Sequence, residues 1–307
     1  MKTFFVSFLF LISFNLNSYD RITGLEFASR SEVIANNGMA ATSHPLATQT
    51  AISILKSGGN AIDAAIAANA VLGLVEPTGC GIGGDLFAIV WIEKDKKLYG
   101  LNSSGPAPKN ISIEKIKDLG LDKIPPYGPL PISVPGAVEG WSALHKKFGK
   151  FEFAKLFDDA INYAENGFPV SELIAYYLNR SSEIFKDYKN FQKVWMPNGV
   201  TPKKGDIFKN PLLAQNYRDI ASSYGEAFYR GKIADDIVKS INDEGGFYSP
   251  SDLSNFKSEW IEPVSSNYRG YDIWELPPNG QGIAALQILN ILENYDLSSL
   301  KFGSSEY

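Results

Sequence analysis

Apolar residues recur at helical spacing in the first well-patterned segment of the chain. Over residues 46–55, the apolar residues Leu46, Ile52, Ile54 and Leu55 are interspersed with polar and small residues. Pro45 suits the first turn of such a helix, Ser43 is a suitable N-cap, and Gly58 suits its end. The pattern therefore predicts an amphipathic helix that begins near Pro45.

The next segment, AIDAAIAANAVLGLV (61–75), is apolar at almost every position. Asn60 can cap it, and Glu76 ends it because a residue that precedes proline avoids the helical region. A helix that is apolar on nearly all sides packs against neighbours on both faces. We therefore expect this helix at the centre of the fold.

Strand patterns follow the two helices. LFAIVWIE (86–93) and KLYGLNSS (97–104) are joined by a charged turn, and a second strand pair lies within 260–278. Further helical patterns cover residues 133–149, 153–165, 171–185, 211–222 and 283–296. Strand pairs placed between helices predict an α+β fold in which an antiparallel sheet is layered with helices.

The segment GCGIGGD (79–85) matches the G-x-G-x-x-G pattern of dinucleotide-binding loops. In such sites the glycine loop follows a strand and opens a helix whose N-terminus holds the pyrophosphate. Here the loop follows a helix and opens a strand, so a nucleotide-dependent oxidoreductase is disfavoured. We expect the glycines to allow positive φ and close backbone approach, Asp85 to orient the turn, and Cys80 to be a small buried group.

Composition narrows the chemistry further. The 307 residues carry a net charge of −5 without a long run of Lys or Arg, which argues against a nucleic-acid-binding surface. Cys80 is the single cysteine, so an intrachain disulfide and a multi-cysteine metal site are excluded. The two histidines, His44 and His145, lie far apart in sequence, so neither a zinc site nor a Ser-His-Asp triad is indicated.

The first 18 residues differ from the rest of the chain. Lys2 precedes an apolar run from Phe4 to Phe14 that is too short to span a bilayer and matches the apolar region of a signal peptide. A buried first strand is the alternative interpretation. We expect residues 1–18 to be a signal peptide and the mature chain to begin near Tyr19, without a membrane span. The protein would then be secreted or periplasmic.

Four long motifs occur in order along the chain: NGMAATSHPLATQTAISILKSGGNAIDAAIAANAVLGLVEPTGCGIGGDLFAIVW, SVPGAVEGW, AINYAENGFPVSE and YDIWELPPNGQGIAALQILNILENYDL. Together they resemble the γ-glutamyltransferase (γ-glutamyl transpeptidase) family, and the resemblance covers residues 19–307, its large-subunit part. The PPNGQG form resembles the acylase-like branch of the family more than the glutathione-handling branch, which usually carries a serine-rich loop there.

The resemblance implies an N-terminal-nucleophile hydrolase with an αββα sandwich, of which this chain would be an incomplete part. Such a precursor cleaves itself, and a threonine at the new N-terminus attacks the γ-glutamyl amide with its own α-amine as base. No histidine, metal or cofactor is then needed. We expect that threonine beyond residue 307, in a small subunit that partners this chain, so this part alone would be inactive. Glutathione or γ-glutamyl peptide metabolism would be the setting.

A second threonine-led motif, Thr42-Ser43-His44, looks similar to the family's processed terminus. It precedes Pro45 and a helix, whereas the family threonine opens a strand. We therefore interpret this motif as a helix cap. The PNGQG loop (278–282) has two open interpretations, because it either approaches the active-site cleft or only forms the entry to a helix.

One departure from the family concerns substrate binding. γ-Glutamyltransferases place an arginine after the second strand, at the position of Ser104 here, to pair with the substrate α-carboxylate. The acylase-like branch carries it two residues later, at Pro106. We name Asn102, Ser103 and Ser104 as substrate-binding candidates, although they are equally well explained as a polar strand end. The missing arginine also leaves open a catalytically inactive family member that serves as a binding or scaffold protein.

Overall fold

The structure is a computed structural model that describes residues 32–301 and 303–306. The predicted signal peptide, residues 1–18, lies outside the described residues. Ala40–Tyr307 group together by their contacts, and all of the elements discussed below belong to this unit. Among the described residues, no helix has both the length and the apolar character needed to cross a membrane.

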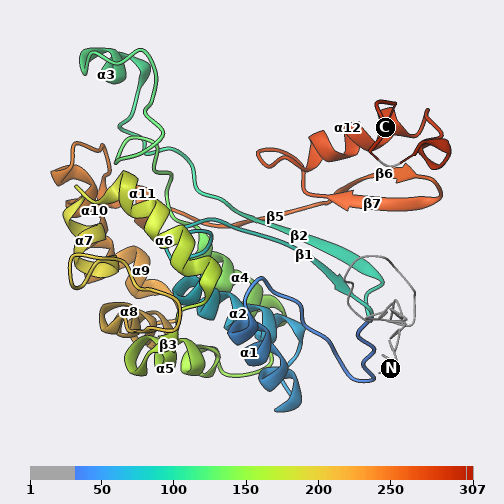
Figure 1. The fold of residues 1–307 in the computed structure, drawn as a ribbon, viewed down its shortest axis with the longest axis horizontal. Helices are drawn as coiled ribbons and strands as arrows, with labels where there is room; N and C mark the ends of the chain where they lie inside the picture. The colour runs from blue at the N-terminus through green and yellow to red at the C-terminus, as the bar shows by residue number, and fades with distance from the viewer. Residues whose placement is uncertain (1–31, 302, 307) are drawn as a thin grey trace, which may run out of the picture. The chain divides into compact units, whose positions relative to one another are not determined.

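Helices make up most of the regular structure (Figure 1). The helices within the described residues are α1 (Pro45–Lys56), α2 (Ala61–Val75), α3 (Ile113–Asp118), α4 (Ala137–Phe148), α5 (Asp158–Asn166), α6 (Glu172–Phe185), α7 (Lys189–Trp195), α8 (Pro211–Ser222), α9 (Glu226–Arg230), α10 (Lys232–Asp243), α11 (Pro250–Ser254) and α12 (Gly282–Leu292), with short 3-10 turns η1 (Phe153–Phe157) and η2 (Leu297–Ser299). The helices expected from the sequence are all present. Residues 113–118, 189–195 and 226–254 hold helices that the sequence patterns did not identify.

The strands form three antiparallel groups in the described part of the chain. The main sheet has the order β1-β2-β5, and two separate pairs are β3-β4 and β6-β7. Their bounds are β1 (Leu86–Ile92), β2 (Lys97–Ser103), β3 (Phe168–Pro169), β4 (Ile207–Phe208), β5 (Glu259–Ile261), β6 (Val264–Tyr268) and β7 (Tyr271–Glu275). Both hairpins expected from the sequence are thus confirmed, and α12 packs against the β6-β7 pair (Figure 1).

Helix α2 lies at the centre of the core, as its sequence predicted. Its apolar residues are almost all buried, and it contacts α1, α4, α5 and η1. Asn60 caps it through a reciprocal pair of hydrogen bonds with Asp63, whose side chain is fully buried. Asp63 also accepts hydrogen bonds from the backbone N–H groups of Lys150 and Phe151, which ties the start of α2 to the end of α4.

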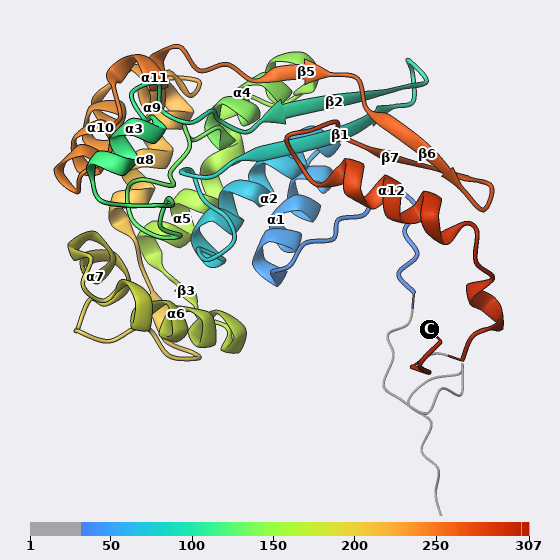
Figure 2. The same ribbon diagram turned by 90° about the horizontal axis from the view of Figure 1, so that it is seen from above.

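The main sheet covers the helical core with one face only. Along β1, Leu86, Ala88 and Val90 pack against the core, whereas the alternate side chains point away from it. The outward-facing residues Phe87, Ile89 and Trp91 are 45%, 41% and 51% exposed. Within the described residues, β1, β2 and β5 lie side by side (Figure 2), and the core packs on one face of this sheet, as one sheet of an αββα sandwich does.

Two local expectations were wrong. The N-cap of α1 is His44, whose Nδ1 accepts a hydrogen bond from Leu46 N–H, and Ser43 instead bonds to Glu76. The glycines of the 79–85 segment do not adopt positive φ. An added Cβ at Gly83 would meet no atom within 4 Å, so this part of the loop does not require glycine.

Candidate functional site

A polar pocket of about 670 Å³ lies where β2 ends and the PNGQG loop passes beside it. Asn102 and Ser104 line it from β2 and the residues that follow, and Pro278 and Asn279 line it from the loop. Two segments about 175 residues apart, both noted in the sequence, therefore meet at one cavity. The PNGQG loop thus leads into α12 and also lines a pocket, so it does more than form the entry to a helix.

The polar side chains of this pocket hold one another in place. Asn102 Nδ2 donates a hydrogen bond to Asn279 Oδ1 at 2.9 Å, and Ser104 Oγ donates to Asn102 Oδ1 at 2.9 Å. Asn279 Nδ2 in turn donates to Ser104 Oγ at 2.8 Å, which closes a ring of hydrogen bonds. Such a ring fixes the orientation of both amide groups, so donors and acceptors are presented to the cavity in a defined arrangement.

Ser103 does not line this pocket. Its side chain is fully buried, and its hydroxyl donates to the carbonyl of Gly136 at 2.7 Å and contacts Ser258 Oγ at 2.6 Å. Ser258 N–H donates to Glu139 Oε2 at 2.9 Å. Because alternate residues of a strand point to opposite faces, Asn102 and Ser104 face the cavity while Ser103 joins the sheet to α4 behind it. Its role in the structure is to position its neighbours, and we do not retain it as a substrate contact.

Close backbone contacts hold the pocket wall. A Cβ added at Gly136 would lie 1.8 Å from the Ser103 carbonyl oxygen, and one added at Gly105 would lie 1.7 Å from that of Val134. Val134 N–H donates to the carbonyl of Pro106 at 2.9 Å. The segment that carries Ser104 is therefore pressed against the SVPGAVEGW segment at distances that only glycine permits.

The 79–85 loop has a structural role at the same place. The carbonyl oxygen of Gly84 accepts hydrogen bonds from Gly136 N–H and Ala137 N–H, each at 2.9 Å. These donors are at the N-terminus of α4, which has no side-chain cap, so the loop carbonyl satisfies groups that would otherwise be unpaired. No nucleotide is needed to explain this loop. Cys80 within it is half-buried, and burial together with Glu76 raises the pKa of its thiol, which disfavours the nucleophilic thiolate.

Charged side chains also line the pocket: Lys109, Asp252, Lys257 and Glu259. Asp252 is buried and already has partners, since it accepts hydrogen bonds from Lys109 N–H and from the N–H and hydroxyl of Ser249. Burial alone would raise the pKa of Asp252, but these hydrogen bonds outweigh burial and lower it. Neither lysine forms an ion pair with another described residue.

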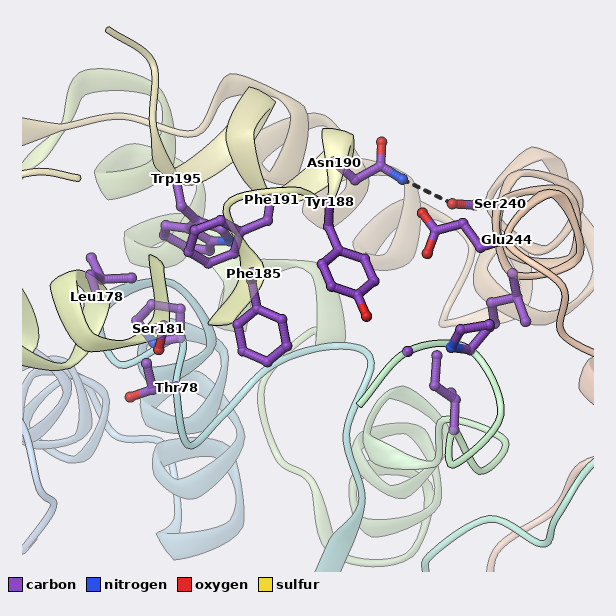
Figure 3. Close-up of a pocket in the computed structure, with 15 residues that line it drawn as sticks. Thr78, Leu178, Ser181, Phe185, Tyr188, Asn190, Phe191, Trp195, Ser240 and Glu244 are labelled. Atoms are coloured by element: carbon purple, nitrogen blue, oxygen red, sulfur yellow. Dashed lines mark hydrogen bonds between the residues drawn. The ribbon is translucent and has the colours of Figure 1, made fainter. Parts of the chain in front are cut away.

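A second pocket, of about 480 Å³, is aromatic (Figure 3). Its aromatic side chains come from α6, α7 and the turn between them: Phe185, Tyr188, Phe191 and Trp195. At its edge Asn190 Nδ2 donates to Ser240 Oγ at 3.0 Å. Glu244 is the one charged residue in its lining. A cavity with a single carboxylate and no cation does not suit an acidic acyl group, so the polar pocket is the better candidate site.

The gamma-glutamyltranspeptidase family model matches residues 47–307 of this chain. The chain belongs to the gamma-glutamyltranspeptidase family. The resemblance inferred from the sequence motifs is therefore confirmed, and so is the assignment to the large-subunit region.

Curated relatives carry related names. The glutathione hydrolase-like YwrD proenzyme of Bacillus subtilis (strain 168) is 37% identical over 276 residues, and the glutathione hydrolase proenzyme of Escherichia coli (strain K12) is 32% identical over 283 residues. The alignments cover 90% and 89% of this chain but 52% and 48% of those relatives. The chain thus spans about half the length of the curated relatives it matches.

Two solved structures are similar to this fold. Cephalosporin acylase from Bacillus halodurans has a TM-score of 0.84 and 43% identity, covering 92% of this chain and 53% of the acylase chain. Helicobacter pylori gamma-glutamyltranspeptidase has a TM-score of 0.84 and 34% identity, covering 90% and 80%. The chain therefore has the mixed α/β fold of the N-terminal-nucleophile hydrolases, and the acylase match agrees with the branch indicated by PPNGQG.

Sequence reasoning named Asn102 and Ser104, which line the polar pocket, but it did not name Asn279 or Lys257. Asn279 had a local signal, because it lies in a glycine-containing loop that opens a helix. Lys257 had none, since an isolated lysine in a polar segment is common on protein surfaces. Its place beside the pocket follows from the fold, because Lys257 lies just before β5, which pairs with β2.

Proposed function

We propose that this chain is the large-subunit part of a self-processing amidohydrolase or acyltransferase that cleaves γ-glutamyl or related acyl amides. The nucleophile would be a threonine that follows residue 307 in the complete protein. Family membership and the word proenzyme in the names of the relatives support processing into two subunits. The observation that carries the proposal is the outward face of the β1-β2-β5 sheet.

That face is divided into an apolar and a polar half. Phe87, Ile89 and Trp91 are exposed on β1, and the paired residues of β2 on the same face run from Leu98 to Asn102. Large apolar side chains that alternate along an exposed strand suit a second sheet packed face to face. We propose that the C-terminal part of the same precursor packs on this face, because the relatives are about twice as long as this chain.

The candidate pocket lies at the polar half of this face, so it would be at the edge of the contact with the second sheet. A threonine at the head of a strand in the second sheet would then lie beside the acyl group bound here. In this mechanism the threonine hydroxyl attacks the amide carbonyl while the threonine α-amine accepts the hydroxyl proton. The amide C–N bond then breaks, and the amine product leaves with that proton. The resulting ester passes its acyl group to water or to an amino acid. Asn102, Ser104 and Asn279 would orient the acyl group.

The test uses the complete precursor, purified and followed by gel electrophoresis and by release of nitroaniline from γ-glutamyl and glutaryl anilides. We expect unaided conversion to two fragments, the larger of which contains this chain, and amide hydrolysis only after that conversion. A folded precursor that stays as one band would contradict the proposal. It would favour the alternative, an inactive family member, which the missing arginine at Ser104 and Pro106 motivates.

A further inference from the structure

One of the two lysines in the candidate pocket lies just before β5, the strand that pairs with β2, whereas family resemblance places a cation after β2 itself. Ser104 occupies the position of the expected arginine, and its hydroxyl cannot neutralise a carboxylate. Lys257 lines the same pocket but comes from the segment that leads into β5, more than 150 residues later in the chain. Strand pairing decides how these two residues lie relative to each other.

The β2-β5 ladder pairs Gly100 with Ile261, Leu101 with Trp260, and Asn102 with Glu259. The same register continues beyond the ladder, because the hydroxyls of Ser103 and Ser258, the next opposed pair, are 2.6 Å apart. Extended by one more step, this register places Lys257 opposite Ser104. Directly opposed residues of an antiparallel pair share a face and have Cβ atoms about 5 Å apart.

The backbone on both sides of Lys257 is held in place. Ser258 N–H donates to Glu139 Oε2 at 2.9 Å, and Phe256 N–H donates to the carbonyl of Leu253 at 3.1 Å. The Phe256 ring is buried and stacks on Tyr229 with the ring centroids 5.9 Å apart. Lys257 itself is exposed and has no ion-pair partner among the described residues, so its ammonium group is available to a ligand in the pocket.

We propose that Lys257 binds the carboxylate of the acyl group, together with the Ser104 hydroxyl and the Asn279 amide. This inference rests on the proposed function and deepens it by naming the specificity-determining cation. An ammonium group paired with a carboxylate forms a charge-assisted hydrogen bond, about twice as strong as a neutral one. Glu259 lies in the next row of the same face, beside Asn102, and charges of opposite sign in adjacent rows suit an acyl group that carries both an ammonium and a carboxylate.

The experiment measures kcat/KM of the processed full-length protein for three anilides: γ-glutamyl, glutaryl and butyryl. The first two carry a carboxylate on the same carbon and the third lacks it. Lys257→Ala should lower kcat/KM for the two carboxylate substrates about ten- to a hundredfold, while leaving the butyryl anilide within about twofold. Lys257→Arg should retain most activity. Lys56→Ala, at an exposed position on α1, is the matched control and should change none of the three values.

A double variant tests the cross-strand placement. Ser104→Arg in the Lys257→Ala background returns a cation to the opposed position, and it should restore preference for glutaryl over butyryl anilide. An unchanged glutaryl-to-butyryl ratio in Lys257→Ala would overturn the inference, even with an active enzyme. A uniform loss for all three substrates would also overturn it, because that pattern indicates a structural role.

A binding measurement separates this inference from the proposed function. Calorimetry compares glutamate with 4-aminobutyrate, which lacks only the α-carboxylate. Lys257→Ala should weaken glutamate binding about ten- to a hundredfold and leave 4-aminobutyrate binding unchanged. This outcome without turnover of any anilide would support the Lys257 site while refuting the proposed function. Equal glutamate affinity in the wild type and in Lys257→Ala would refute the Lys257 site.

Discussion

Replacing Gly136 by alanine probes the backbone contact that positions the pocket wall. The new Cβ would lie 1.8 Å from the Ser103 carbonyl oxygen, whereas real Cβ atoms essentially never approach a neighbour within 3.0 Å. The two backbone segments would therefore have to separate by about 1 Å. The atoms concerned belong to backbone on both sides, so no flexible side chain can move to relieve the contact.

The expected cost can be estimated from the contacts that such a shift disturbs. Overpacking of this kind costs about 1–3 kcal/mol. The shift would also weaken the hydrogen bond from Ser103 Oγ to the Gly136 carbonyl and the bond from Gly136 N–H to the Gly84 carbonyl, each of which contributes about 1 kcal/mol. Gly136→Ala should therefore lower the free energy of unfolding by about 3–5 kcal/mol.

Gly83→Ala is the matched control, because the added Cβ meets no atom within 4 Å and the backbone there is not left-handed. It should be neutral or stabilise the protein by about 0.5 kcal/mol through the lower entropy of the unfolded chain. Urea unfolding of the full-length protein, followed by tryptophan fluorescence, compares the two variants. Equal unfolding midpoints for Gly136→Ala and Gly83→Ala would refute the close-contact argument.

Three further outcomes are expected. Burial lowers the pKa of His44 below 6.5, only partly offset by Glu76, so the unfolded chain binds the proton more tightly. The free energy of unfolding should therefore fall as the pH drops through 6.5. Urea unfolding midpoints measured between pH 8 and 5 should fall less in His44→Asn than in the wild type. Asp63→Asn should lower the free energy of unfolding by about 2–4 kcal/mol, because an amide nitrogen cannot accept the hydrogen bonds that backbone N–H groups donate to the carboxylate. The control is Asp118→Asn, at an exposed position. N-terminal sequencing of the exported protein should begin near Tyr19, and recovery of Met1 would contradict export.

Local sequence patterns determined most of the core of this protein. The apolar segment 61–75 can remove its side chains from water only as a buried helix, and α2 lies at the centre of the core. The β-branched and aromatic residues of 86–92 likewise predicted β1, and the charged turn after them predicted its partner strand. These features depend on residues close together in the chain, so local composition and spacing are enough to determine them. Family motifs, which are also local, identified the fold.

Where the local signal was weak or ambiguous, the predictions failed. The amphipathic segment 232–243 was overlooked as a helix, although Ile233, Ile237 and Ile241 follow helical spacing. Ser43 and His44 both precede Pro45, and only the packed structure shows which of them caps α1. The glycines of 79–85 were expected to adopt positive φ, but a glycine-rich sequence reveals neither the φ of each glycine nor which neighbour approaches it.

The candidate site depended on tertiary structure. Asn102 and Ser104 were visible as a polar strand end, but their separation from Ser103 came from the direction in which each side chain leaves the strand. Asn279 and Lys257 join them because a loop and a strand pairing bring distant segments together. Pairing register is set by the hydrogen-bonded ladder and by contacts such as that between Ser103 and Ser258, which lie 155 residues apart. A pattern within one segment carries no information about such a register, so only the folded chain shows that Lys257 and Ser104 line the same pocket.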